Sequence, residues 1–184
     1  MMKLITEVSP RFKARMAGIL YFFSLLTAGV GESLLHGGLG RAAGLAGVSG
    51  MIVITLIFYN IFKQVNRGIC LLAAFINLVG LAFEALRLNP YGVDIALVFD
   101  GFYCILVGYL IFKSAFLPQI LGALMAFAGL GWLTFVSLPL ANHLSPYNIA
   151  AGILCEASVM LWLIVMGVNS QRWKEQAGAA ALRE

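Results

Sequence analysis

Six long apolar stretches constrain the fold of this chain more than any other feature of its sequence. They cover residues 16–35, 43–62, 68–87, 94–112, 120–140 and 147–168. About 20 helical residues cross a hydrocarbon core of about 30 Å, so each stretch is long enough to span a membrane. Because the connections are short, neighbouring helices should run antiparallel. We therefore predict an all-α polytopic membrane protein, a six-transmembrane-helix bundle of three sequential α-hairpins.

The composition agrees with a membrane protein and excludes a soluble one. Hydrophobic residues make up 61% of the chain and charged residues only 11%, whereas about a quarter of the residues in a soluble domain are charged. The net charge of +4 comes from short basic runs between apolar stretches, which is not the basic face of a nucleic-acid-binding protein. The lipid bilayer is the expected partner. The three cysteines form no CxxC pair, and we predict no cofactor.

The distribution of basic residues predicts how the helices are oriented. One side, with segment 1–15 and tail 169–184, carries ten of them: Lys3, Arg11, Lys13, Arg15, Lys63, Arg67, Lys113, Arg172, Lys174 and Arg183. The opposite side carries only Arg41 and Arg87. Because basic loops stay on the cytoplasmic side, we predict cytoplasmic termini on either side of a transmembrane domain of residues 16–168. We also expect the polar tail to form a short helix on the cytoplasmic surface.

A faint internal repeat accompanies the hairpins. Residues 59–63 (Tyr-Asn-Ile-Phe-Lys) resemble residues 109–113 (Tyr-Leu-Ile-Phe-Lys), which lie fifty positions later. Three similar hairpins pointing the same way would give a pseudo-threefold bundle. Chance matching among helices rich in leucine, alanine and phenylalanine is the alternative interpretation, and the sequence leaves both open.

Acidic residues are concentrated where they are least expected. Five of the eight lie inside the apolar stretches or at their edges: Glu32, Glu84, Asp94, Asp100 and Glu156. Ionisable groups at membrane depth are costly and indicate functional sites. At a rise of 1.5 Å per residue, Glu156 falls near the membrane midplane and the other four fall in the outer half. We therefore predict an acidic, water-accessible pocket in the outer half, with its floor near Asp100 and Glu156.

The candidate ligand-binding residues of this pocket combine acids with aromatic side chains able to make cation–π contacts. They are Glu32, Glu84, Asp100, Glu156, Tyr103 and Trp132. Structural interpretations stay open beside this one. Glu84 could pair with Arg87, three residues further along the helix, and Glu32 and Asp94 could be hydrated residues at helix ends.

Metal-ligand patterns are nearly absent. His36 and His143 are the chain's two histidines and its candidate metal ligands, but the sequence has no HExxH motif or comparable close metal-binding spacing. We therefore predict no metal centre from the sequence.

Small residues at helical spacing predict close contacts between helices. They form a ladder on the second stretch and a set on the fifth: Ala42, Ala46 and Gly50, and Gly122, Gly129 and Gly131. We expect these positions to serve packing rather than ligand binding.

Four segments resemble a known family. They are residues 14–21 followed by Glu32, residues 63–67 leading into 71–75, residues 108–118 leading into 121–122, and Glu156 ahead of residues 161–169. The segments resemble a bacterial six-span membrane family known as domain of unknown function 4386, and the Phe-Lys-Ser-x-Phe-Leu-Pro stretch is the most specific. The resemblance implies six helices and a bacterial cytoplasmic (inner) membrane, and it implies no activity. Many relatives carry a histidine soon after the aspartate of the fourth span, whereas Asp100 is followed by Gly-Phe-Tyr, which weakens a histidine-based mechanism.

Three functions compete. The favoured one is binding or transport of a cation, an amine or an amphipathic small molecule in the acidic pocket. The second is a non-catalytic accessory or interaction subunit of a membrane complex. The third is a metal-dependent membrane hydrolase that uses Glu32, His36, His143 and Asp100 as ligands. The sequence does not establish whether the protein is an enzyme.

Overall fold

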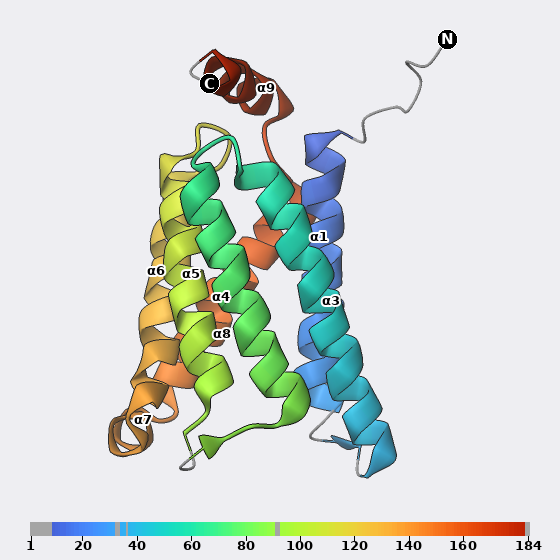
Figure 1. Ribbon diagram of the computed structural model, residues 1–184, viewed down its shortest axis with the longest axis vertical. Helices are drawn as coiled ribbons and strands as arrows, with labels where there is room; N and C mark the ends of the chain where they lie inside the picture. Colours follow the sequence, from blue (N-terminus) through green and yellow to red (C-terminus); the bar gives the residue numbers. More distant parts are fainter. Residues whose placement is uncertain (1–8, 32–33, 36, 91–92, 183–184) are drawn as a thin grey trace.

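The computed structural model describes all residues except 1–8, 32–33, 36, 91–92 and 183–184. The described part of the chain consists of helices joined by short loops, without strands, as Figure 1 shows. In chain order the helices are α1 (Pro10–Leu25), the π-helix η1 (Leu26–Gly31), α3 (Gly38–Phe62), α4 (Arg67–Leu86), α5 (Ile95–Lys113), α6 (Gln119–Leu133), the 3₁₀ helix η3 (Thr134–Val136), α7 (Leu138–Leu144), α8 (Tyr147–Val165) and α9 (Ser170–Ala181).

Several of these helices have the length and apolar composition that are required to cross a membrane. Within the described residues, five are long and apolar enough to do so: α3, α4, α5, α6 together with η3, and α8. An all-α protein with several membrane-capable helices is therefore confirmed. The count of six spans and the threefold repeat are not confirmed.

The first predicted stretch, 16–35, is divided between two kinds of helix. α1 begins earlier, at Pro10, because the Ser9 hydroxyl caps its first turn and proline is favoured at that position. After Leu25 the chain continues as η1, where the Thr27 hydroxyl donates back to carbonyl groups of the preceding turn. Such bonds compete with the regular helical pattern. α1 alone has 16 residues, fewer than the roughly 20 that a span needs.

The fifth predicted stretch, 120–140, also departs from a single helix. α6 ends at Leu133, and the short helices η3 and α7 follow it. Ser137 has an extended backbone with φ −129°, and Pro139 lies in the first turn of α7. Proline lacks a backbone N–H and cannot continue a preceding helix, so the chain begins a new one here.

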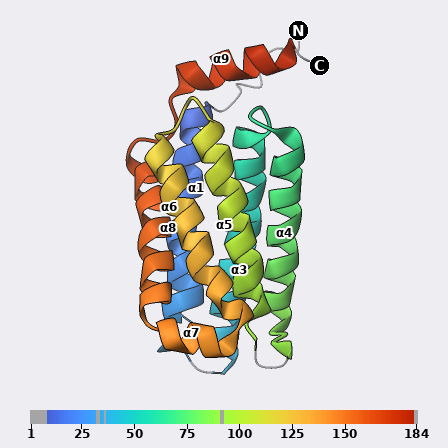
Figure 2. The ribbon, with the colours of Figure 1, turned by 90° about the vertical axis from the view of Figure 1, so that its left-hand side faces the viewer.

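The long helices pack in chain order and close on themselves. α1 contacts α3, α3 contacts α4, α4 contacts α5, α5 contacts α6, α6 contacts α8, and α8 returns to α1. Figure 2 shows them side by side, with α7 at one end and α9 lying across the other. The short helix predicted for the tail is therefore confirmed, and its place at a membrane surface stays a prediction. The Trp173 indole N–H donates to the Ile61 carbonyl at 3.1 Å, which ties α9 to the end of α3.

The closest helix contact joins α5 to α6 through glycine. A Cβ atom placed on Gly122 would lie 2.6 Å from the Gly108 carbonyl oxygen, and one on Gly129 would lie 2.5 Å from that of Gly101. Only residues without side chains allow two backbones to approach this closely. The packing role predicted for the glycines of the fifth stretch is therefore confirmed for Gly122 and Gly129.

An apolar core fills the half of the molecule toward α9. Its largest fully buried side chains are Ile54 and Ile61 of α3, Leu110 and Ile111 of α5, and Met125 of α6. The opposite half, toward α7, contains a cavity with polar lining residues, and the candidate site lies there.

Candidate functional site

Glu156 of α8 is the most deeply buried acidic side chain in the described part of the chain. Only 4% of its surface is exposed. Its carboxylate accepts hydrogen bonds from the Tyr21 hydroxyl of α1 and from the Trp132 indole N–H of α6. A buried carboxylate is strongly unfavourable unless donors of this kind replace its water. The two donors orient both carboxylate oxygens and hold the side chain between three helices.

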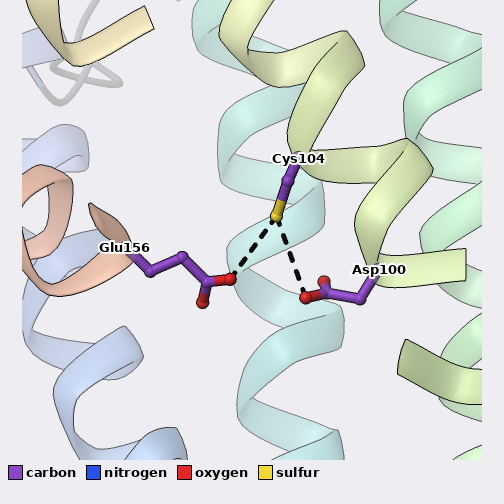
Figure 3. Close-up of side chains that lie close together, drawn as sticks. All are labelled: Asp100, Cys104 and Glu156. Carbon is purple, nitrogen blue, oxygen red and sulfur yellow. Dashed lines mark hydrogen bonds between the residues drawn. The ribbon is translucent and has the colours of Figure 1, made fainter. Parts of the chain in front are cut away.

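Cys104 of α5 connects Glu156 to a second acid. Its Sγ atom lies 3.5 Å from Glu156 Oε1 and 3.8 Å from Asp100 Oδ2. Asp100 and Cys104 are four residues apart, so they lie on one face of α5. Figure 3 shows the thiol between the two carboxylates. One potential ligand atom from each residue lies within 4.8 Å of the other two, and we call Asp100, Cys104 and Glu156 the acid–thiol cluster.

A cavity of about 560 Å³ reaches the two carboxylates of this cluster. Its inner part is lined by Tyr21, Asp100, Trp132 and Glu156, and other lining residues include Asn77, Glu84, Arg87, Asn89 and Asp94. Glu84, Arg87 and Asn89 are exposed at the end of α4, so the cavity extends from the surface to the buried cluster. The volume is within the range of about 300–1,000 Å³ that is usual for small-molecule sites.

Four of the predicted site residues line the cavity, at different depths. Asp100, Glu156 and Trp132 meet at the inner end of the cavity, and Glu84 lies on its exposed part. Trp132 takes part as a hydrogen-bond donor to Glu156, which differs from the cation–π role expected for it.

Three other candidates do not join this group. Tyr103 is buried and lines a separate void of about 10 Å³ with Thr55 and Cys70. His143 is exposed on α7 and does not line the cavity. Glu32 and His36 lie outside the described residues.

Two residues of the site escaped the sequence analysis. Tyr21 lies among mostly apolar residues of its helix, and Cys104 belongs to no CxxC pair. A usable signal did exist for Cys104, since its spacing of four from Asp100 places both on one helix face. For Tyr21 we find no signal in the sequence, because its partner Glu156 is 135 positions away.

The fold and the site define an all-helical protein that has several helices long and apolar enough to cross a membrane and a buried acid–thiol cluster at the inner end of a surface cavity. Residues 83–167 match the family model of a domain of unknown function (DUF4386), and this confirms the resemblance noted in the sequence. The matched region contains all three residues of the cluster.

A curated relative extends the comparison to archaea. An uncharacterized protein of Archaeoglobus fulgidus is 25% identical over 127 residues, which cover 63% of this chain and 76% of the relative. No solved structure gives a significant match.

Proposed function

We propose that this protein binds a cation or an amine in the cavity that ends at Asp100 and Glu156, and that it holds or transports this ligand within a membrane. One observation carries the proposal. Two carboxylates from different helices converge on the inner end of a single cavity of small-molecule size. Buried acids in a membrane protein are typical of ion and substrate pathways.

The chemistry of the inner cavity favours a positive ligand. The donors of Tyr21 and Trp132 are already directed at Glu156, so the carboxylate is fixed before any ligand arrives. A fixed anion in a low-dielectric site attracts a cation far more strongly than it would in water. The two aromatic rings at the same end of the cavity add faces against which an alkylammonium group can pack.

We further propose that α1 and η1 together supply a sixth span in a bacterial cytoplasmic membrane. Both termini would then lie in the cytoplasm beside α9, and the cavity would open toward the outer side. Lys63 follows α3 and Lys113 ends α5, and α9 is hydrogen-bonded to residues at these two helix ends, so basic residues lie on the α9 side and support this orientation. A fluorescent protein fused after Glu184 should fold and fluoresce, whereas a periplasmic alkaline phosphatase fused there should stay inactive.

Ligand-dependent thermal stability of the purified protein tests the proposed function. A series of alkylammonium ions should raise the unfolding temperature, since a ligand at about 100 times its Kd stabilises the folded state by about 2.7 kcal/mol. The Glu156→Gln variant should lose this response, because the amide carries no charge and keeps nearly the same shape. Uptake of the same ions into proteoliposomes separates transport from binding.

The control is the same glutamate-to-glutamine substitution at an exposed position outside the cavity. Glu175 is exposed on α9, where it accepts a hydrogen bond from Gln171, so Glu175→Gln should respond to the ligands as the wild type does. An unchanged response in Glu156→Gln contradicts the proposal.

A further inference from the structure

We propose that the acid–thiol cluster is a binding site for a borderline-soft divalent metal ion, with Zn²⁺ as the preferred ion. This inference rests on the proposed function, because it identifies the class of cation that the cavity takes. Its ligands would be one oxygen each of Asp100 and Glu156 and the sulfur of Cys104.

The distances within the cluster match the size of such an ion. Tetrahedral zinc has Zn–S bonds of about 2.3 Å and Zn–O bonds of about 2.0–2.2 Å, which together separate sulfur and oxygen ligands by about 3.5 Å. The Sγ atom of Cys104 is 3.5 Å from Glu156 Oε1 and 3.8 Å from Asp100 Oδ2. All three ligand atoms lie within 4.8 Å of one another, so small side-chain shifts are enough to surround an ion.

The types of ligand select the class of metal. A thiolate is a soft ligand that favours zinc and other late transition metals, whereas magnesium and calcium take oxygen ligands. One sulfur with two carboxylate oxygens therefore favours Zn²⁺ over the common hard cations. The ion would also offset the negative charges of two buried carboxylates and a thiolate.

Surrounding residues already support one of the ligands. Tyr21 and Trp132 donate hydrogen bonds to Glu156 from two other helices. Metal-binding carboxylates are commonly held in this way by outer partners, which set their orientation. Glu156 Oε2 accepts one hydrogen bond and keeps a free lone pair, and loss of the Cys104 thiol proton on metal binding frees a lone pair of Oε1. Metal binding and the bonds from Tyr21 and Trp132 are therefore compatible.

Binding exchanges protons for metal bonds. Zinc–sulfur and zinc–oxygen bonds form, the S–H bond of Cys104 breaks, and its proton leaves through the cavity to solvent. Three protein ligands leave the fourth tetrahedral position for water or for a polar group of a second molecule. Asp100 and Glu156 line the cavity, which supplies the route for both the ion and that molecule.

Cobalt substitution of the full-length purified protein tests the site. Co²⁺ bound by a thiolate gives a sulfur-to-cobalt charge-transfer band in the near ultraviolet, and we expect this band at one equivalent of Co²⁺ in the wild type. Zn²⁺ should displace the cobalt and abolish the band. Cys104→Ser should lose the band.

Cys155→Ser is the matched control, because Cys155 is also a buried free thiol and adjoins Glu156 without belonging to the cluster. This variant should keep the band. A band that persists in Cys104→Ser, or that disappears only in Cys155→Ser, overturns the assignment.

Two further variants keep the test decisive if Cys104→Ser does not fold. Tyr21→Phe keeps all three ligands and removes only a supporting hydrogen bond, so it should keep the band and weaken Zn²⁺ binding by about 10–100-fold. Asp100→Asn should weaken binding at least as much. Wild-type affinity for Zn²⁺ in both variants overturns the site.

The outcomes for the metal and for the proposed function are separable. Alkylammonium stabilisation that depends on Glu156, without any cobalt or zinc binding, overturns the metal site and leaves the proposed function standing. Absence of both responses overturns both. Zinc binding without an alkylammonium response supports the metal site and narrows the proposed function to metal ions.

Discussion

Two adjoining faces of α5 differ in chemistry, although they belong to the same 19-residue helix. On one face the row of Gly101 and Gly108, seven residues apart, lies against α6 with backbone next to backbone. On the adjoining face Asp100 and Cys104 lie near Glu156, and Asp100 and Glu156 line the cavity. One face is dry and made of groups without side chains. The other is polar and reached by a surface cavity.

The comparison shows how packing positions the chemistry. Trp132 follows Gly129 by three residues on α6, and its ring lies over Gly152 of α8, where an added Cβ would be 2.6 Å from the indole. The close α5–α6 contact and this glycine together allow the indole N–H to reach Glu156. The glycine face therefore sets the position of a donor in the candidate site.

The largest effect is expected from a substitution that disrupts the glycine contact between α5 and α6. Gly122→Ala should lower the free energy of unfolding by about 3 kcal/mol, the upper part of the usual range for overpacking. The new Cβ would lie 2.6 Å from the Gly108 carbonyl oxygen and 2.8 Å from the Phe112 backbone nitrogen, and backbone atoms cannot rotate away. Equilibrium unfolding in detergent, followed by circular dichroism, measures the change.

Gly178→Ala on α9 is the control for this prediction. A Cβ at Gly178 meets nothing within 4 Å, and alanine is the better helix former. Gly178→Ala should therefore be neutral or slightly stabilising. Equal losses in the two variants would show that the α5–α6 contact is not the cause.

A smaller loss of unfolding free energy is expected when a hydrogen-bond donor to the polar face is removed. Trp132→Phe should cost about 2 kcal/mol of unfolding free energy, because it removes a hydrogen bond to a charged group and leaves Glu156 with one donor fewer. Trp173→Phe makes the same change where the acceptor is the neutral Ile61 carbonyl, and it should cost about 1 kcal/mol. The same unfolding measurement compares them, and a larger loss for Trp173→Phe would contradict the charged state assumed for Glu156.

The smallest effect is expected at a glycine that lies close to a side-chain atom rather than to backbone atoms. A Cβ on Gly50 would lie 2.1 Å from the Ser24 hydroxyl oxygen, which is a rotatable side-chain atom. The hydroxyl can turn away, and the gain in helix propensity of up to about 1 kcal/mol offsets the remaining strain. Gly50→Ala should therefore change the unfolding free energy by less than about 1 kcal/mol. A loss as large as that of Gly122→Ala would mean that the α1–α3 contact is as rigid as the α5–α6 contact.

Much of the helical structure could be predicted from apolar length, because a chain in a membrane must satisfy its backbone hydrogen bonds within helices. The exceptions come from local competition. The Thr27 hydroxyl accompanies the change from α1 to a π-helix, and Pro139 starts a new helix after α6. A single hydroxyl or proline that decides such a boundary contributes little to the mean hydropathy of a stretch of about 20 residues.

The candidate site could be predicted only in part. Asp100 and Glu156 stand out because acids are rare within apolar stretches. Tyr21 and Cys104 do not, since both residue types are common in apolar helices. Tyr103 was predicted for the site as an aromatic side chain able to make cation–π contacts, yet it lines a different void.

The sequence by itself determined that this chain forms apolar helices and that a few acids lie within them, because hydrophobic length and charge are local properties. Only the tertiary structure decided which of those acids meet. Closure of α8 against α1 brings Tyr21 to Glu156, and the packing of α5 brings Cys104 between two carboxylates. These contacts join residues up to 135 positions apart, and they depend on how helices rotate and approach one another.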